Sequence, residues 1–208
     1  MIRAILFDFD GTVGDTFPLV LKTANDLLLE MGQERITNPE SYRSKSAFEI
    51  LRASGIPFWK LPALRQKAVT RMANEFQETP SFAGMKSILE LLRGSYTIGV
   101  VTSNDAEPVE AVLRKQKIGV DFLYAGHSIF GKHRVIRACL REQGLLPEEV
   151  IYVGDEVRDI DACRKAGVKI ISVTWGFNSK QRLAQAKPDA IVDTPSQLVQ
   201  KIRQMAKN

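Results

Sequence analysis

Short apolar runs alternate with helix-like apolar spacings along most of the chain. The short runs, rich in β-branched and aromatic residues as buried strands are, cover 3–8, 97–102, 122–126, 150–153, 169–173 and 190–192. Amphipathic helical spacing, with apolar residues every three or four positions, covers 85–92, 107–116, 132–143, 157–166, 179–186 and the stretch from 196 onward. Strands that alternate with helices of this length predict βαβ units and a parallel, doubly wound α/β sheet.

One long stretch departs from this alternation. From Phe17 to about Phe82 no strand-like run occurs, and apolar residues follow helical spacing, first from Leu19 to Met31, before Gly32 ends the helix. Further helical patches cover 46–53 and 59–76. The pattern predicts an α/β core domain of residues 1–15 and 83–208, interrupted by a helical cap domain of residues 16–82. We call residues 16–82 the helical insertion.

Length and composition agree with such a packed protein. The 208 residues suffice for a core domain with a smaller inserted one, and 44% hydrophobic with 25% charged residues excludes a disordered chain. No apolar run approaches the ~20 residues that cross a bilayer. The two cysteines, Cys139 and Cys163, fall in helical spacings and indicate no disulfide framework. We therefore expect a cytoplasmic protein without a membrane partner.

The charge distribution narrows the class of partner. The formal net charge is +5, but the Lys and Arg residues are scattered, and no basic block interleaved with aromatic residues stands out. Nucleic-acid binding is therefore not expected. A basic balance can help to attract anionic metabolites, so the predicted partner is a small molecule.

Polar residues gather where predicted strands end. The four segments are Asp8-Phe9-Asp10-Gly11-Thr12, Thr102-Ser103-Asn104, Gly131-Lys132, and Gly154-Asp155 with Asp159. Parallel sheets bind ligands outside the carboxyl ends of their strands, where helix N-termini and backbone N–H groups point outward. The order of these segments therefore predicts one pocket.

The residue types predict a metal-dependent phosphate chemistry. Asp8 and Asp10 lie on the same side of an extended chain, and Asp155 would add a third carboxylate, so the site needs a shared proton or a cation. Three oxygen donors without a Cys or His cluster favour Mg²⁺ over zinc. Mg²⁺ and Lys132 would offset phosphoryl charge. The candidate phosphate-binding residues are Gly11, Thr102, Ser103, Asn104 and Lys132.

These motifs together resemble the haloacid dehalogenase superfamily of phosphotransferases, over nearly the whole chain. The pattern is Asp-x-Asp-Gly-Thr, a strand-end Thr, Gly-Lys and Gly-Asp-x-x-x-Asp. The helical insertion is similar to the mobile helical cap of that superfamily. Gly-Thr-Val-Gly-Asp-Thr and Tyr-Val-Gly-Asp-Glu-Val-Arg-Asp-Ile resemble its phosphoglycolate phosphatase-like branch, whose members act on several small phosphate esters.

The resemblance implies a role for each motif residue. Asp8 would be the nucleophile that forms an aspartyl-phosphate, and Asp10 would protonate the leaving oxygen and then activate water. Thr102 would hydrogen-bond the phosphoryl group, and Lys132 would steady Asp8 and the phosphate. Metal ligands would be Asp8, Asp155 and the backbone carbonyl of Asp10, with Asp159 orienting a metal-bound water or Lys132.

Some positions fall outside the shared pattern. Glu156 stands where a Ser or Thr is commoner in relatives, and no role is assigned to it. Arg43 and Lys45, in the cap between two predicted helices, are candidates for contacting the substrate, although a solvated polar turn is the simpler interpretation. Trp175 and Phe177 are expected to cover the edge or rim of the sheet.

Four other functions share part of this pattern, of which the phosphomutase is the main alternative and the dehalogenase is discounted. A phosphomutase would share all four motifs and return the phosphoryl group to a sugar. A dehalogenase has no use for a general acid such as Asp10. A phospho-accepting signalling receiver would lack the helical insertion and an acid at the Asp10 position. A non-catalytic binding protein would have little reason to keep every motif residue.

Overall fold

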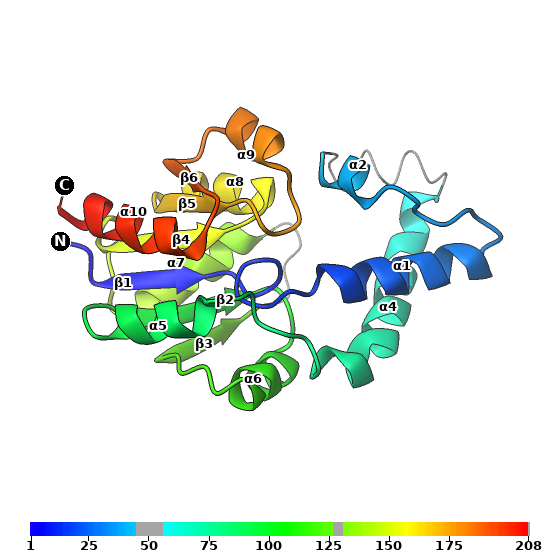
Figure 1. Cartoon of the computed structure of the whole chain (residues 1–208), viewed down its shortest axis with the longest axis horizontal. Helices are drawn as coiled ribbons and strands as arrows, with labels where there is room; N and C mark the ends of the chain where they lie inside the picture. Colours follow the sequence, from blue (N-terminus) through cyan, green and yellow to red (C-terminus); the bar gives the residue numbers. More distant parts are fainter. Residues whose placement is uncertain (45–55, 127–130, 208) are drawn as a thin grey trace.

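The fold follows the predicted alternation of strands and helices. The computed structural model describes residues 1–44, 56–126 and 131–207 (Figure 1). A six-stranded sheet has the order β3-β2-β1-β4-β5-β6, with every pair parallel. The strands are β1 (Ala4–Phe7), β2 (Thr97–Thr102), β3 (Phe122–Ala125), β4 (Val150–Gly154), β5 (Lys169–Val173) and β6 (Ala190–Val192). The predicted doubly wound α/β fold is confirmed.

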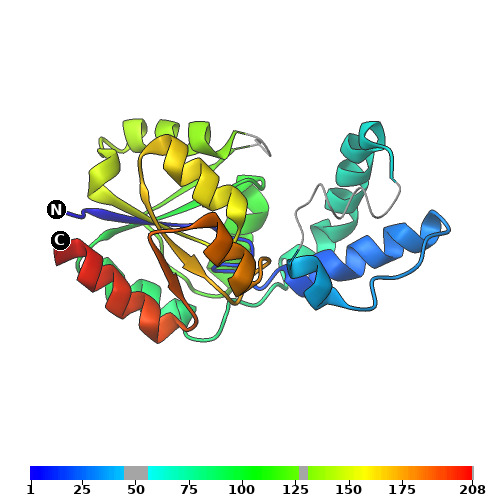
Figure 2. The same cartoon turned by 90° about the horizontal axis from the view of Figure 1, so that it is seen from above.

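Helices cover both faces of the sheet (Figure 2). One hydrophobic cluster joins a sheet face to α5 (Met85–Arg93), α6 (Ala106–Lys115) and α10 (Pro195–Lys207). A second cluster joins the other face to α7 (Lys132–Glu142), α8 (Val157–Ala166) and α9 (Lys180–Ala186); a 3-10 turn, η2 (Pro147–Glu149), precedes β4. Because both faces are covered, the strands are buried on both sides and appear in the sequence as unbroken apolar runs.

The order of the strands creates the position of the site. The chain winds from β1 through β2 to β3, and then places β4, β5 and β6 on the other side of β1. β1 and β4 are therefore neighbours where the winding reverses, with Phe7 opposite Val153. Loops that leave such a switch point diverge and leave a crevice for a ligand. Asp8 and Asp155 begin these two loops.

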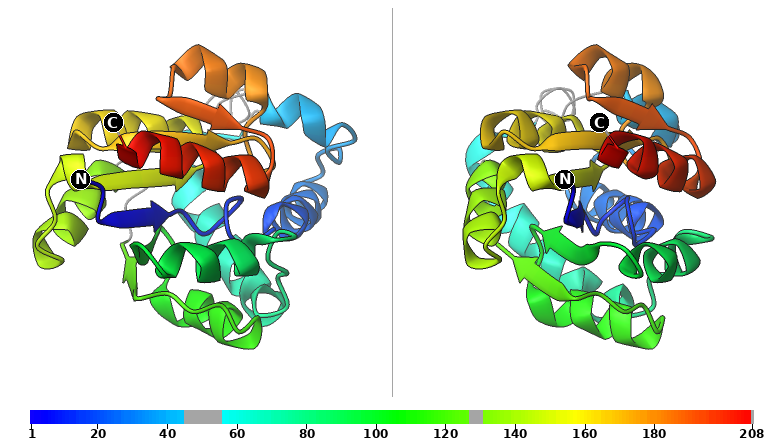
Figure 3. Two further views of the ribbon diagram at one scale, coloured as in Figure 1. Left: turned by 60° about the vertical axis from the view of Figure 1, so that its left-hand side comes forward. Right: turned by 90° about the vertical axis from the view of Figure 1, so that its left-hand side faces the viewer.

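The helical insertion lies beyond the carboxyl ends of the strands, away from both termini (Figures 1 and 3). Its described elements are α1 (Phe17–Glu30), α2 (Pro39–Arg43), η1 (Phe58–Lys60) and α4 (Leu61–Phe76). α1 and α4 pack against each other. The helix predicted over 46–53 falls outside the described residues, and the division into core and cap domains stays a prediction. None of the described helices is long and apolar enough to span a membrane.

Two linkers join the helical insertion to the sheet, and they are hydrogen-bonded to each other. The N–H of Asp15 donates to the carbonyl of Pro80 at 2.8 Å, and the N–H of Phe82 donates to the carbonyl of Val13 at 3.0 Å. Between these bonds, a Cβ on Gly14 would lie 2.9 Å from a neighbouring aromatic ring. The insertion is therefore attached through two linkers that lie side by side and are hydrogen-bonded to each other, next to the turn that follows β1.

Candidate active site

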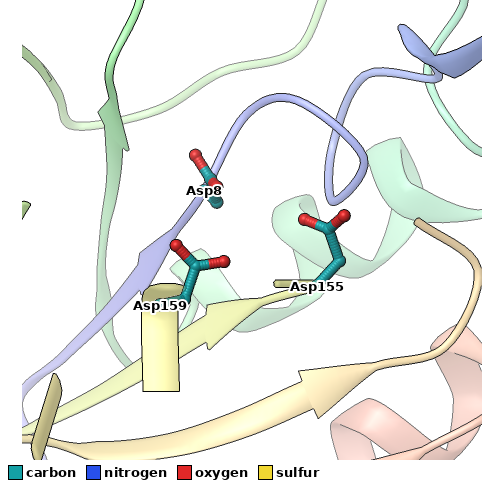
Figure 4. A group of neighbouring side chains, drawn as sticks. All are labelled: Asp8, Asp155 and Asp159. Carbon is teal, nitrogen blue, oxygen red and sulfur yellow. The ribbon is translucent and has the colours of Figure 1, made fainter. Parts of the chain in front are cut away.

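Three carboxyl groups from distant parts of the chain meet at the carboxyl end of the sheet. Asp8 follows β1, Asp155 follows β4, and Asp159 lies in the first turn of α8 (Figure 4). Each offers one oxygen within 4.8 Å of the oxygens of the others, and all three residues are buried. The structure thus brings together acids that lie up to 151 positions apart in the sequence, which is the difference between 8 and 159.

Lys132 bridges two of these acids. It is the first residue of α7, directly after Gly131, and it is 5% exposed. Its Nζ atom lies 2.6 Å from Oδ2 of Asp8 and 2.5 Å from Oδ1 of Asp159. The dipole of α7 opposes a cation at its N-terminus, and the two carboxylates offset this cost.

Burial and these ion pairs set the protonation of the acidic group. Loss of hydration raises the pKa of Asp8 to about 7, although Lys132 opposes the rise. Burial also raises the pKa of Asp155 well above its usual value. Burial alone would lower the pKa of Lys132, but the carboxylates of Asp159 and Asp8 raise it, so the ammonium group stays charged. At neutral pH the acidic group therefore favours a bound proton or a further cation.

Asp155 is held through both of its carboxylate oxygens. Oδ1 accepts a hydrogen bond from the hydroxyl of Thr12 at 2.9 Å, and Oδ2 accepts one from the backbone N–H of Phe177 at 2.6 Å. Gly11 has φ of +73°, and a Cβ there would lie 2.3 Å from Oδ2 of Asp155. Glycine is thus required for the loop after β1 to approach Asp155. Phosphate binding by Gly11 stays a prediction.

Asp10 and the turn after β2 form a second cluster beside the first. The side-chain amide of Asn104 donates to Oδ2 of Asp10 at 2.6 Å, and the Asn104 backbone N–H donates to Oγ1 of buried Thr102 at 3.0 Å. Asp10 is partly exposed, yet loss of hydration raises its pKa to about 6. A carboxyl group with such a pKa can give and take a proton near neutral pH. Ser103 lies in the same turn, and its phosphate contact stays a prediction.

The donor set fits a hard divalent cation. Asp8, Asp155 and Asp159 supply carboxylate oxygens, with no Cys or His in this group of described residues, and Mg²⁺ prefers oxygen ligands. Asp159 uses one oxygen for the lysine and accepts a backbone N–H with the other at 3.1 Å. Both carboxylate oxygens of Asp8 and of Asp155 are hydrogen-bonded as well. These bonds therefore do not rank the three acids, and direct metal binding by Asp8 and Asp155 stays a prediction. The Asp10 carboxylate is not part of this group, and its backbone carbonyl stays a predicted ligand.

Of the two substrate-contact candidates in the helical insertion, Lys45 lies outside the described residues. Arg43 ends α2 rather than standing in a solvated turn. Its carbonyl accepts the N–H of Ser179 at 2.9 Å, and its guanidinium carbon lies 4.4 Å from the centre of the Phe17 ring. Phe17 in turn meets Phe177 edge-on, with ring centroids 5.3 Å apart. Arg43 therefore lies where the helical insertion meets the loop that holds Asp155.

Two contacts of the site were not predicted from the sequence. Thr12 belongs to the Asp-x-Asp-Gly-Thr motif, but the motif does not reveal that its hydroxyl holds Asp155. Phe177 was expected only at the rim of the sheet, and it donates through its backbone N–H, which nearly every residue type has. Glu156, which had no assigned role, pairs with Arg158.

The sequence of the chain matches a known family. Residues 5–173 fit the sequence model of the haloacid dehalogenase-like hydrolases. The chain belongs to the haloacid dehalogenase-like hydrolase family. It is 34% identical over 209 residues to a phosphoglycolate phosphatase of Synechococcus elongatus, covering 98% of this chain and 99% of that protein. It is 28% identical over 217 residues to a putative pyrophosphatase, PpaX, of Clostridium perfringens, covering 99% of both.

Solved structures show the same fold. A haloacid dehalogenase-like hydrolase, SP0104 of Streptococcus pneumoniae, has a TM-score of 0.83 at 24% identity and covers 97% of this chain and 98% of its own. A putative phosphoglycolate phosphatase of Lactobacillus delbrueckii has a TM-score of 0.81 at 22% identity, covering 96% and 98%.

The predicted superfamily and its phosphoglycolate phosphatase-like branch are confirmed, and the chain is a phosphatase. The sheet order also separates it from a signalling receiver, whose doubly wound sheet has the order 2-1-3-4-5.

Proposed function

We propose that this phosphatase hydrolyses the phosphate ester of a small carboxylic acid, with Mg²⁺ as cofactor and an aspartyl-phosphate on Asp8 as intermediate. The ion pair between Asp8 and Lys132 carries the proposal. A carboxylate that must attack an anionic phosphoryl group needs a cation beside it, and Lys132 provides one 2.6 Å away in a buried setting.

In the first step, a carboxylate oxygen of Asp8 attacks phosphorus and the ester P–O bond breaks. The electron pair stays on the leaving oxygen, which takes a proton from Asp10. The pKa of Asp10, raised to about 6 by loss of hydration, keeps a usable protonated fraction near neutral pH. Lys132 offsets the charge on the phosphoryl oxygens, while Thr102 and Ser103 hydrogen-bond to them.

In the second step, a water molecule attacks the phosphorus of the aspartyl-phosphate. Asp10, now a carboxylate, takes a proton from this water, the bond between phosphorus and the Asp8 oxygen breaks, and inorganic phosphate leaves. The hydrogen bond from Asn104 keeps the Asp10 carboxyl group in one orientation throughout. Asp159 does the same for Lys132, through the 2.5 Å ion pair.

The carboxylates of Asp8 and Asp155, with the backbone carbonyl of Asp10, would hold the Mg²⁺ ion. When bound, the ion neutralises negative charge on the phosphoryl group and on the carboxylates. Thr12 and Phe177 keep the Asp155 carboxylate in place. This division of roles is consistent with the raised pKa values of Asp8 and Asp155, because buried acids that resist ionisation gain most from a cation.

The helical insertion would act as a lid over this site. A lid that closes can exclude water during phosphoryl transfer and admit it for hydrolysis when it opens. The paired linkers around Gly14 are the natural pivot, since they are the covalent connection to the sheet.

Arg43 is the candidate receptor for a second anionic group of the substrate. Its Nε atom is buried without a hydrogen-bond partner among the described residues, and its ion pair with mostly exposed Glu40 is loose, at 3.5 Å. The Synechococcus elongatus relative is named for phosphoglycolate, which carries a carboxylate beside its phosphate. A guanidinium group binds a carboxylate well. Lys45 remains the second candidate.

A substrate panel tests this function. Phosphoglycolate, a generic aryl phosphate, pyrophosphate and a sugar phosphate are each assayed for phosphate release with Mg²⁺ and with a chelator. We expect Mg²⁺-dependent release, the highest kcat/KM for phosphoglycolate, and no turnover by Asp8→Asn. Arg43→Gln is expected to raise KM for phosphoglycolate while leaving the aryl phosphate unaffected.

Each alternative has its own outcome in this panel. Normal turnover by Asp8→Asn would remove Asp8 as nucleophile. Preference for pyrophosphate, the substrate in the name of the Clostridium perfringens relative, would overturn the carboxylic acid substrate. Phosphoryl transfer to a sugar without net phosphate release would indicate a mutase. Mg²⁺ binding without any turnover would indicate a binding protein.

A further inference from the structure

The loop that follows β5 contacts Asp155 from several directions. We call residues 174–179 the β5 loop. The N–H of Phe177 donates to Oδ2 of Asp155 at 2.6 Å, and the N–H of Asn178 donates to the Asp155 carbonyl at 3.3 Å. Oδ1 of Asn178 accepts the N–H of Val157, the first residue of α8, at 2.9 Å. The β5 loop therefore holds the carboxylate of Asp155, the backbone of Asp155 and the start of α8.

A glycine brings the β5 loop this close. A Cβ on Gly176 would lie 2.1 Å from Oδ2 of Asp155 and 2.3 Å from the carbonyl oxygen of Gly11. Both distances are far below van der Waals contact, so no side chain fits at Gly176 unless the loop or the site moves. The β5 loop and the two strand-end loops of the site are thus packed as one unit.

The same loop contacts the helical insertion. The N–H of Ser179 donates to the carbonyl of Arg43 at 2.9 Å, and the hydroxyls of Ser44 and Ser179 are 3.4 Å apart. The ring of Phe177 meets Phe17 edge-on, with ring centroids 5.3 Å apart, and the guanidinium carbon of Arg43 lies 4.4 Å from the centre of the Phe17 ring. Phe17 is the first residue of α1, directly after the linker.

We propose that the β5 loop is a positioning element, which couples the placement of Asp155 to the docking of the helical insertion. Phe177 is its central residue, since its N–H holds Asp155 and its ring holds Phe17. The inference rests on the proposed function in one respect, that Asp155 is a metal ligand. It goes beyond it by linking the Mg²⁺ affinity of the site to the docking of the insertion.

Such coupling is reciprocal by thermodynamic necessity. Contacts that dock the helical insertion hold the β5 loop, and through it Asp155, so we expect them to tighten Mg²⁺ binding. Mg²⁺ binding must in turn stabilise the docked insertion by the same factor. A substrate that closes the insertion would then strengthen the metal site at the moment when phosphoryl transfer needs it.

Calorimetric titration with Mg²⁺ alone tests whether the docking contacts tighten Mg²⁺ binding. We expect Phe17→Leu, which removes a ring on the helical insertion and no predicted ligand, to weaken Mg²⁺ binding about two- to tenfold, the range of one aromatic pair. Gly176→Ala is expected to weaken it more, because it displaces the loop from Asp155. Phe17→Leu combined with Phe177→Leu should cost less than the two single effects together, because either change alone breaks the pair.

Hydrogen exchange tests whether Mg²⁺ binding stabilises the docked insertion. We expect Mg²⁺ to slow amide exchange in α1 of the wild-type protein, and to slow it less in Gly176→Ala.

Two variants serve as matched controls and should bind Mg²⁺ as the wild type does. Gly94→Ala adds a Cβ that meets only an ordinary 3.5 Å contact. Tyr96→Leu removes an aromatic ring from the opposite end of the sheet, directly before β2.

The outcomes separate this inference from the proposed function. If the wild-type protein binds no Mg²⁺, the metal site fails and the coupling fails with it. If the wild type binds Mg²⁺ and hydrolyses phosphate esters while Phe17→Leu and Gly176→Ala bind Mg²⁺ equally well, only the coupling is overturned. If Gly176→Ala does not fold, Phe17→Leu decides alone. Weaker binding in the control variants would also overturn it, as an effect of general destabilisation.

Discussion

The α/β core and the helical insertion are built by different means. Every residue of β1 and β4 is buried, and hydrophobic clusters cover both faces of the sheet. Few of the described residues of the insertion are buried: Thr16, Thr23, Leu27, Phe76 and Thr79. Between α1 and α4 lie exposed ion pairs such as those of Glu30 with Lys67 and Arg71. Exposed pairs of this kind contribute little stability.

The difference fits the roles proposed for the two regions. Chemistry at phosphorus needs groups held in one geometry, and the core provides this through strand ends and buried ion pairs. A lid needs a low free-energy cost of movement, and a segment with few buried contacts provides that. The comparison predicts that the same kind of substitution has a large effect in the core and a small one in the insertion.

The largest effect is expected from Asp10→Asn. An amide cannot protonate the leaving oxygen, so kcat should fall by about 10²–10⁴-fold while substrate still binds. Steady-state kinetics with phosphoglycolate measures the fall. Asp161→Asn, an exposed acid of α8, is the matched control and should keep wild-type rates. Unchanged rates for Asp10→Asn would contradict its role as acid and base.

The next effect compares two lysines by stability. Lys132→Met leaves two buried carboxylates without their partner and should lower the free energy of unfolding by about 3–5 kcal/mol. Lys67→Met removes an exposed pair with Glu30 and should leave the unfolding midpoint nearly unchanged. Urea unfolding of the metal-free wild type and of both metal-free variants measures these changes in the free energy of unfolding. Equal losses would show that the core and the insertion do not differ as described.

The smallest of the three effects comes from fixing the helical insertion to the core. The hydroxyls of Ser44 and Ser179 are 3.4 Å apart, so cysteines at both positions are placed to form a disulfide. The oxidised double variant should turn over about an order of magnitude more slowly, and a reductant should restore it. Ser44→Cys alone is the control. Buried Cys139 and Cys163 should not compete. Equal rates in both redox states would argue against opening of the insertion.

Much of the core was predictable from local pattern. The apolar run before Asp8 predicted β1. The structure confirms a strand there, with every residue buried between the helices on the two faces of the sheet. The predicted α8, Val157 to Ala166, is the observed helix, since Gly167 with φ of +80° ends it. The predicted helix from Ser179 begins instead at Lys180, because Ser179 is its N-cap and accepts the N–H of Arg182. Short α2 was not predicted, since five residues carry too little periodicity.

The sequence by itself determined which residues have the chemistry: acids, hydroxyls and a lysine at strand ends, in an order that one family shares. Only the tertiary structure decided their partners. Asn104, expected to bind phosphate, contacts Asp10, and Phe177 holds Asp155 through a backbone group that no residue type marks. The sequence gives the type of each side chain. A hydrogen bond between residues far apart in the sequence depends on how strands pair and loops pack, and this arrangement exists only in the folded chain.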